Sequence, residues 1–106
     1  MRAAILGICL ALPAYAGGEA EQSALLTLEG DVEYGEYLAS QCTSCHQPDG
    51  ADDGIPGIVG WPEETFRLTM LDFRRKTREH EVMNMIAGRL TDEEIAALSA
   101  YFSKTD

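Results

Sequence analysis

Basic residues are scarce in this chain. Only eight of its 106 residues are Lys or Arg, against 18 Asp or Glu, and the formal net charge is −10. Phosphate backbones are bound by clustered cations, so this composition argues against a nucleic-acid-binding protein. The same excess of carboxylates would be repelled by an anionic membrane surface. A hydrophobic content of 45% still indicates a folded domain rather than a disordered chain.

The N-terminal apolar run, residues 3–12, is too short to cross a bilayer as a helix, which needs roughly 20 residues. The run follows Arg2 and precedes Pro13 and the sequence Ala14-Tyr15-Ala16. A positive start, a short apolar run and small residues at a cleavage point are typical of a secretory signal peptide. We therefore predict a signal peptide over residues 1–16, export to the periplasm, and no membrane span after its removal. The alternative is a buried N-terminal helix.

The sequence also lacks internal repeats and any segment with the alternation of a strand. The predicted fold class is therefore all-α. Residues 17–30 are interpreted as an N-terminal arm or linker, and residues 31–104 as one domain.

Three helices are predicted within this domain, together with a short segment over residues 81–88. The first begins near Asp31, which suits an N-cap. After a loop over residues 47–60, rich in Gly and Pro, the second begins at Pro62. The last begins at a capping box formed by Thr91 and Glu94. The second helix ends in a basic run, Arg74, Arg75, Lys76 and Arg78, which could complement the helix dipole or hold an anionic group of a ligand.

Cysteine is rare as well: the chain has three, and Cys9 would leave with the signal peptide. The other two lie in Cys42-Thr43-Ser44-Cys45-His46, the C-x-x-C-H attachment signature of c-type haem. Two thiols three residues apart on one helical turn face the same side, so both can reach the vinyl groups of a single haem. His46 follows directly, which places its imidazole within reach of the iron.

Three other interpretations of Cys42 and Cys45 compete with haem attachment. A thioredoxin-like redox pair needs a βαβ setting, which the pattern does not provide. A zinc site needs a second ligand pair, and no second C-x-x-C or H-x-x-x-H follows. A disulfide in a helical domain without a cofactor is the remaining alternative for an exported chain.

From Asp31 to Ser103 the sequence resembles the class I monohaem cytochromes c. Gly35-Glu-Tyr-Leu38 leading into the C-x-x-C-H motif is similar to the first helix of that family, and residues 91–102 are similar to its last helix. The resemblance implies a small cytochrome c fold, with three to four helices wrapped around one covalently attached haem. It also implies that the N- and C-terminal helices cross, with Gly35 and Leu38 against Leu98 and Tyr101.

Two further stretches resemble parts of this family. Residues 55–58 resemble the loop in which a proline carbonyl, here that of Pro56, accepts a hydrogen bond from the proximal imidazole. An ordinary turn is the alternative reading of Pro56. Residues 61–87 resemble the cytochrome subunit of flavocytochrome c sulfide dehydrogenases and similar small periplasmic carriers.

The resemblance implies a methionine as the sixth ligand of the iron, since a thioether is a soft ligand that raises the potential. Met83 matches the family position, four residues before Ala87, and Met85 is the alternative. Met70 is expected in the core of the second helix. His80 would give a bis-His iron, although a solvated histidine is the plainer interpretation.

These features predict a single-electron carrier rather than an enzyme, either free in the periplasm or as the cytochrome subunit of an oxidoreductase. The excess acid predicts a redox partner with a basic docking surface, and a flavoprotein subunit is the candidate where the chain is part of a complex. An open-site haem protein that binds peroxide or a small gas is the alternative function; it requires a sixth position without a side chain.

Overall fold

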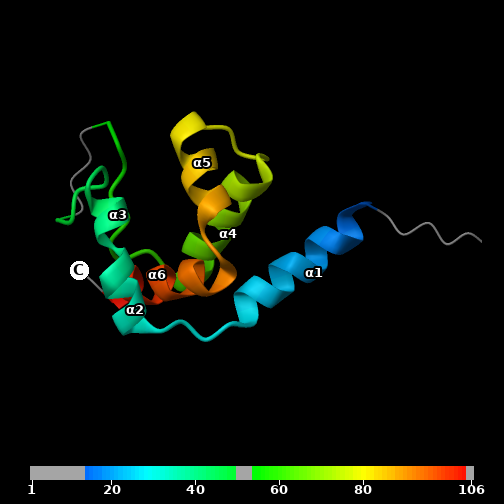
Figure 1. Ribbon diagram of the computed structural model, residues 1–106, viewed down its shortest axis with the longest axis horizontal. Coiled ribbons are helices and arrows are strands. Elements are labelled where there is room, and N and C mark those ends of the chain that lie inside the picture. Colours follow the sequence, from blue (N-terminus) through cyan, green and yellow to red (C-terminus); the bar gives the residue numbers. More distant parts are fainter. Residues whose placement is uncertain (1–13, 50–53, 105–106) are drawn as a thin grey trace, which may run out of the picture.

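The computed structural model describes residues 14–49 and 54–104, and these ranges form an all-helical protein, as predicted. The helices are α1 (Ala14–Thr27), α2 (Val32–Leu38), α3 (Ser40–Thr43), α4 (Glu63–Arg75), α5 (Glu81–Arg89) and α6 (Asp92–Lys104). Figure 1 shows α1 at one end of the elongated molecule and α2 and α3 at the other. Among the described residues, the structure contains no helix whose length and apolarity would suit a membrane crossing.

The helix that leads to the cysteines begins where the sequence predicted. The Asp31 side chain caps α2 by accepting hydrogen bonds from the backbone N–H groups of Glu33, at 3.0 Å, and Tyr34, at 3.3 Å. Ala39 separates α2 from α3 but keeps right-handed helical dihedrals, φ −62° and ψ −25°. The two segments therefore follow one another with little change of direction, and the cysteine turn continues the path of α2.

The predicted crossing of the N- and C-terminal helices is present between α2 and α6. A Cβ atom on Gly35 would lie 2.1 Å from the carbonyl oxygen of Ala97 and 2.7 Å from the Cβ of Tyr101. Only a residue without a side chain allows the two backbones to approach this closely. Leu38 and Leu98, the other expected partners, are both buried in the core.

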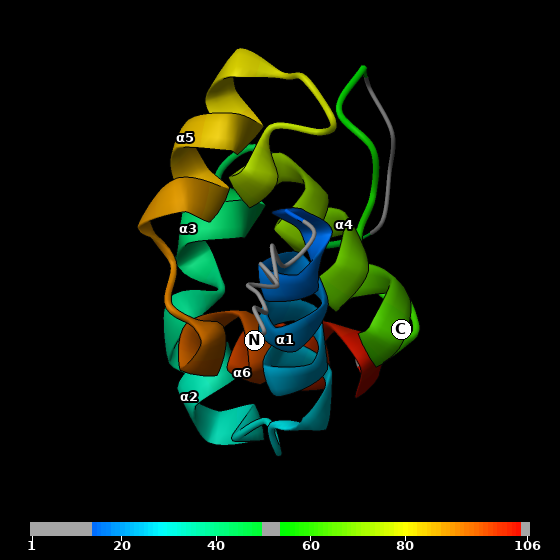
Figure 2. The same cartoon turned by 90° about the vertical axis from the view of Figure 1, so that its right-hand side faces the viewer.

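Helix α6 is the centre of the fold. Figure 2 shows it between α2 and α4. Its N-terminus carries the predicted capping box: the backbone N–H of Thr91 donates to Glu94 Oε1 at 2.8 Å, and that of Glu94 donates to Thr91 Oγ1 at 3.1 Å. Phe102 stacks on Phe66 of α4 with 5.9 Å between ring centroids, and Met70 is buried in the same core, as expected.

The segment after the predicted signal peptide differs from expectation. The sequence pattern predicts an arm or linker over residues 17–30, but most of these residues belong to α1, which packs against α4 and α6. Leu25 is fully buried in the domain core, so burial of apolar surface holds the segment in place. The predicted cleavage bond, between Ala16 and Gly17, falls within α1, whereas residues 1–13 of the predicted signal peptide lie outside the described ranges. Helix α1, together with the break at Ala39, raises the number of helical segments above the three to four expected.

A buried arginine holds the C-terminal end of α1. Arg67 on α4 is only 4% exposed, and its guanidinium donates to the carbonyl oxygens of Leu25, at 2.9 Å, and Leu28, at 2.7 Å. It also donates to Ser99 Oγ on α6 at 2.8 Å and pairs with Glu63 at 3.0 Å. The last carbonyl groups of a helix have no partner within the helix, so a cation placed there satisfies them and complements the helix dipole.

Two arginines of the basic run at the end of α4 hold neighbouring helices. Arg74 bridges Asp92 at 2.8 Å and Glu21 at 3.3 Å, and it donates to the carbonyl oxygen of Leu90 at 2.9 Å. Arg75 pairs with the other carboxylate oxygen of Glu21 at 3.1 Å. These two arginines therefore tie α1 and the start of α6 to α4, a role that the sequence pattern did not predict.

Candidate haem site

The two cysteines and the histidine of the C-x-x-C-H motif lie on one helical turn. The backbone N–H of Cys45 donates to the carbonyl oxygen of Cys42 at 3.1 Å, and that of His46 donates to the same oxygen at 2.7 Å. Both thiols are free rather than joined in a disulfide. Cys42 packs against the hydrophobic core, whereas Cys45 is exposed. One side of this turn therefore presents two thiols and an imidazole together.

Burial and the neighbouring Cys45 raise the pKa of the Cys42 thiol from 9.0 to about 11. Burial acts first because a thiolate loses the solvation that water would give it. The sulfur is therefore neutral at physiological pH and packs as a small apolar group. Such surroundings suit a neutral thioether sulfur better than a thiolate.

The imidazole of His46 is held by the loop that the resemblance singled out. Its Nδ1 lies 2.6 Å from the carbonyl oxygen of Pro56. A carbonyl oxygen can only accept, so Nδ1 carries the proton and donates it. This bond fixes the tautomer and the plane of the ring, and it leaves Nε2 free to act as a ligand.

The methionines that could complete the coordination occupy different environments. Met83 is partly buried and packs against the hydrophobic core, as Cys42 does. Met85 is 50% exposed and lies outside the core cluster. Met70, on α4, is buried in the hydrophobic core of the domain. The packing therefore brings Met83, rather than Met85, to the core that also carries the haem motif.

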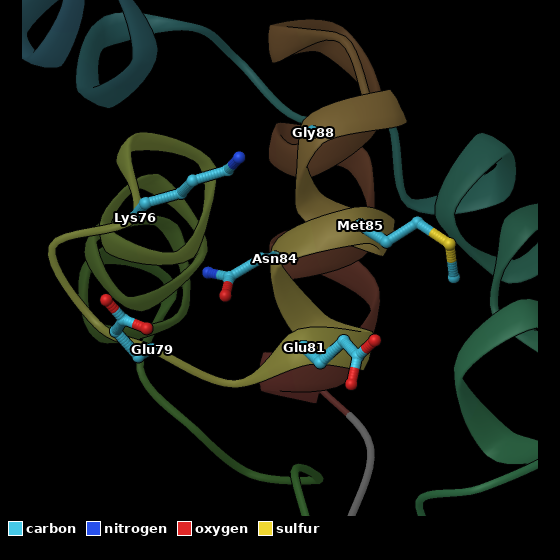
Figure 3. A pocket seen from close by; sticks show the side chains of 6 residues that line it. All are labelled: Lys76, Glu79, Glu81, Asn84, Met85 and Gly88. Carbon is cyan, nitrogen blue, oxygen red and sulfur yellow. The ribbon is translucent and has the colours of Figure 1, made fainter.

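Figure 3 shows the surroundings of Met85. Met85 lines an open pocket of about 580 Å³ between the end of α4 and α5, with Lys76, Glu79, Glu81, Asn84 and Gly88. The Asn84 amide turns towards α4, where its Nδ2 donates to the carbonyl oxygens of Phe73 and Arg78, both at 2.9 Å. The thioether of Met85 extends to the other side of α5. The pocket is lined mainly by polar and charged side chains, so it lacks the apolar walls of a macrocycle site.

His80 has a structural role that neither interpretation of the sequence included. Its Nδ1 accepts a hydrogen bond from the backbone N–H of Met83 at 3.4 Å and so caps the N-terminus of α5. The backbone N–H of His80 donates in turn to Asn84 Oδ1 at 3.0 Å. The sequence gives only a weak signal for this cap, because histidine is not among the common N-cap residues.

The residues around the candidate ligands fit an apolar macrocycle. Ile55 is exposed beside Pro56, and Val82 is exposed beside Met83. Covering either side chain with an apolar group would remove apolar surface from water, which is favourable. The two free thiols and the oriented imidazole form a donor set that suits haem attached through thioether bonds.

A small all-helical domain with this turn and this oriented histidine belongs to the class of proteins built around a covalently attached haem. The family model described as cytochrome c matches residues 32–106. The chain therefore belongs to the cytochrome c family, a family of electron-transfer proteins rather than enzymes. Membership implies a covalently bound haem c with its iron.

Individual relatives agree with a class I cytochrome c. The chain is 36% identical over 69 residues to the cytochrome subunit of sulfide dehydrogenase from Chlorobaculum tepidum, which covers 64% of this chain and 63% of that protein. It is 36% identical over 67 residues to cytochrome c4 from Pseudomonas aeruginosa, covering 57% and 33% of the two chains. It is 30% identical over 88 residues to the thiosulfate dehydrogenase electron acceptor of Stutzerimonas stutzeri, covering 72% and 41%. The chain thus matches less than two thirds of the length of each relative.

Sequence reasoning missed the arginines that join the helices of the domain. Arg67 and Arg74 join α1, α4 and α6. Arg67 lies among the apolar residues of an amphipathic helix, between Phe66 and Met70, and that position is the signal that could have revealed it. A charged residue on an apolar stripe is nearly always paired when it is buried.

Proposed function

We propose that the chain carries single electrons through one haem attached at Cys42 and Cys45, with His46 and Met83 as axial ligands of the iron. The observation that carries the proposal is the contact of 2.6 Å between His46 Nδ1 and the Pro56 carbonyl oxygen. It orients Nε2 as a ligand beside two free thiols on the same turn. The haem iron supplies the chemistry, a change of one electron between its ferrous and ferric states.

The protein residues have separate tasks in this proposal. The cysteines hold the ring covalently, so it cannot be lost when its charge changes. The hydrogen bond to Pro56 fixes the orientation of the His46 imidazole. Met83 adds a soft thioether, which favours the ferrous state and raises the potential. If His46 and Met83 both bind the iron, they would leave no open position for a small molecule.

Mass spectrometry of protein matured in the periplasm tests the attachment. We expect one haem mass added to the polypeptide under denaturing conditions. Cys42→Ser and Cys45→Ser should each lower the yield of holoprotein sharply, because each removes one thioether bond. A polypeptide mass without the haem, or normal holoprotein yields from both variants, would contradict the proposal.

Paired variants test the sixth ligand. Met83→Ala should abolish the weak long-wavelength absorption band of a methionine-ligated ferric haem and lower the potential. Met85→Ala, at the half-exposed position two residues away, is the matched control and should keep the band. Loss of the band in Met85→Ala alone would assign the ligand to Met85. Carbon monoxide binding by the reduced wild-type protein at neutral pH would favour the open-site alternative instead.

The chain is proposed to work in the periplasm, either as a free carrier or as a subunit of an oxidoreductase. The predicted signal peptide supports export. Two relatives named as the cytochrome subunit of sulfide dehydrogenase and as an electron acceptor of thiosulfate dehydrogenase support a dehydrogenase as the partner. A flavoprotein with a basic docking surface would suit the formal charge of −10. Co-purification of the native complex would identify this partner.

A further inference from the structure

Two exposed tyrosines on α2 have no evident role in the core. Tyr37 is 78% exposed and Tyr34 is 38% exposed, and their rings stack with a centroid distance of 6.5 Å and an interplanar angle of 16°. Tyr34 is held in place by a hydrogen bond from its hydroxyl to Glu94 Oε2 at 3.3 Å. An exposed aromatic pair that the fold itself orients is typical of a protein interface, where tyrosine is enriched.

The tyrosines lie on the same face of the helical path as one of the haem cysteines. Tyr34, Tyr37, Gln41 and Cys45 are spaced by three, four and four residues, which is the spacing of neighbours along one helix face. All four are exposed. We call these four residues the tyrosine ridge. At a rise of about 1.5 Å per residue, Tyr37 lies about 12 Å along the path from Cys45. A molecule bound over the tyrosines would therefore lie beside the attached haem.

The charged side chains of α2 and α3 are all of one sign. None of the eight Lys and Arg residues lies between Arg2 and Arg67, so α2 and α3 carry no cation. Glu33 and Glu36 flank the tyrosines and are exposed, and in the part of the chain that the structure describes no cation pairs with them. The arginines of α4 instead point to α1 and α6. A partner with Lys or Arg side chains would find carboxylates and open aromatic faces together here.

We propose that the tyrosine ridge, flanked by Glu33 and Glu36, is the docking surface for a redox partner with a basic surface. The proposal rests on the electron-carrier function proposed above. Carboxylates steer the cationic partner to this end of the molecule and act mainly on the rate of encounter. The tyrosine faces then accept a Lys or Arg side chain by cation–π contact. Electrons would pass at the end of the ridge nearest Cys45.

A cationic oxidant with aromatic ligands, tris(1,10-phenanthroline)cobalt(III), serves as the probe for the full-length holoprotein. The second-order rate constant for oxidation of the ferrous protein is measured by stopped flow at low and high salt. We expect Glu33→Gln combined with Glu36→Gln to lower the rate about three- to tenfold at low salt, with the difference vanishing at high salt. Tyr37→Ala should lower it about threefold at both salt concentrations, whereas Tyr37→Phe should retain the wild-type rate.

The matched control removes the same charge elsewhere. Glu19→Gln combined with Glu64→Gln neutralises two exposed carboxylates on α1 and α4 and should change the rate by less than about twofold. An equal fall in both pairs would show that only net charge matters and would overturn the proposal, as would no fall in either pair or in Tyr37→Ala. Ferricyanide separates this result from failure of the carrier function. A reduced wild-type protein that excess ferricyanide cannot oxidise would refute the electron carrier itself.

Discussion

Replacing Gly35 with alanine tests the close helix crossing that positions the haem motif. The added Cβ would lie 2.1 Å from the Ala97 carbonyl oxygen, whereas carbon–oxygen contacts across helices lie at about 3.3 Å or more. The helices must therefore separate by about 1 Å. The obstacle is a backbone carbonyl on a buried stretch of α6, so no flexible side chain can turn away to make room.

The expected cost follows from two opposing terms. Overpacking of a well-packed interface costs about 1–3 kcal/mol, and the rigid backbone contact at Gly35 places this case near 3 kcal/mol. Alanine recovers about 1 kcal/mol because it loses less backbone entropy than glycine in a helix. The net destabilisation is about 2 kcal/mol. For a domain of this size, this corresponds to a melting temperature lower by about 10 °C.

Thermal unfolding of the holoprotein, followed by far-UV circular dichroism, measures this difference. Gly88→Ala is the matched control, because a Cβ on Gly88 meets only open space on an exposed face of α5. That substitution should raise the melting temperature by a few degrees through helix propensity alone. A Gly35→Ala protein that melts at or above the wild-type temperature would show that α2 and α6 do not cross at this distance.

Two further substitutions probe the supports of the fold by urea unfolding. Arg67→Met should destabilise the protein by about 3 kcal/mol, because it leaves the buried acceptors at the end of α1 and Ser99 Oγ without their donor. Arg78→Ala, which removes an exposed cation–π contact with Phe73, should cost less than about 1 kcal/mol; similar costs for the two arginines would contradict the role given to Arg67. Lys76→Gly should stabilise by about 1 kcal/mol, because Lys76 caps α4 in the left-handed conformation with φ 64°. Lys76→Ala keeps the strained backbone and should bring no such gain, so equal stability of both variants would refute this explanation.

Several features could be predicted because they depend on residues close together in the chain. The C-x-x-C-H motif, the Asp31 cap and the capping box of Thr91 and Glu94 each involve residues within one helical turn. Helical spacing of apolar residues likewise identified the fold class and the burial of Met70. Local geometry alone governs such features, so one sequence is enough to recognise them.

The attachment of α1 could not be predicted in this way. Residues 17–30 contain three Gly and three Glu and show no apolar stripe, so the sequence pattern favours an arm. Leu25 becomes buried only because α4 and α6 provide a surface, and the carbonyl groups near the end of α1 are satisfied by Arg67, about 40 residues later. Tertiary contacts stabilise this helix, because an isolated helix of 14 residues is only marginally stable in water.

The sequence by itself determined the chemistry of this protein: the two thiols, the imidazole and their spacing follow from five consecutive residues. Only the tertiary structure decided what surrounds that chemistry. It brought the Pro56 carbonyl to His46, placed Met83 against the core and Met85 towards solvent, and turned the arginines of α4 to α1 and α6. The physical reason is that each of these contacts joins segments whose relative position depends on how the whole chain packs.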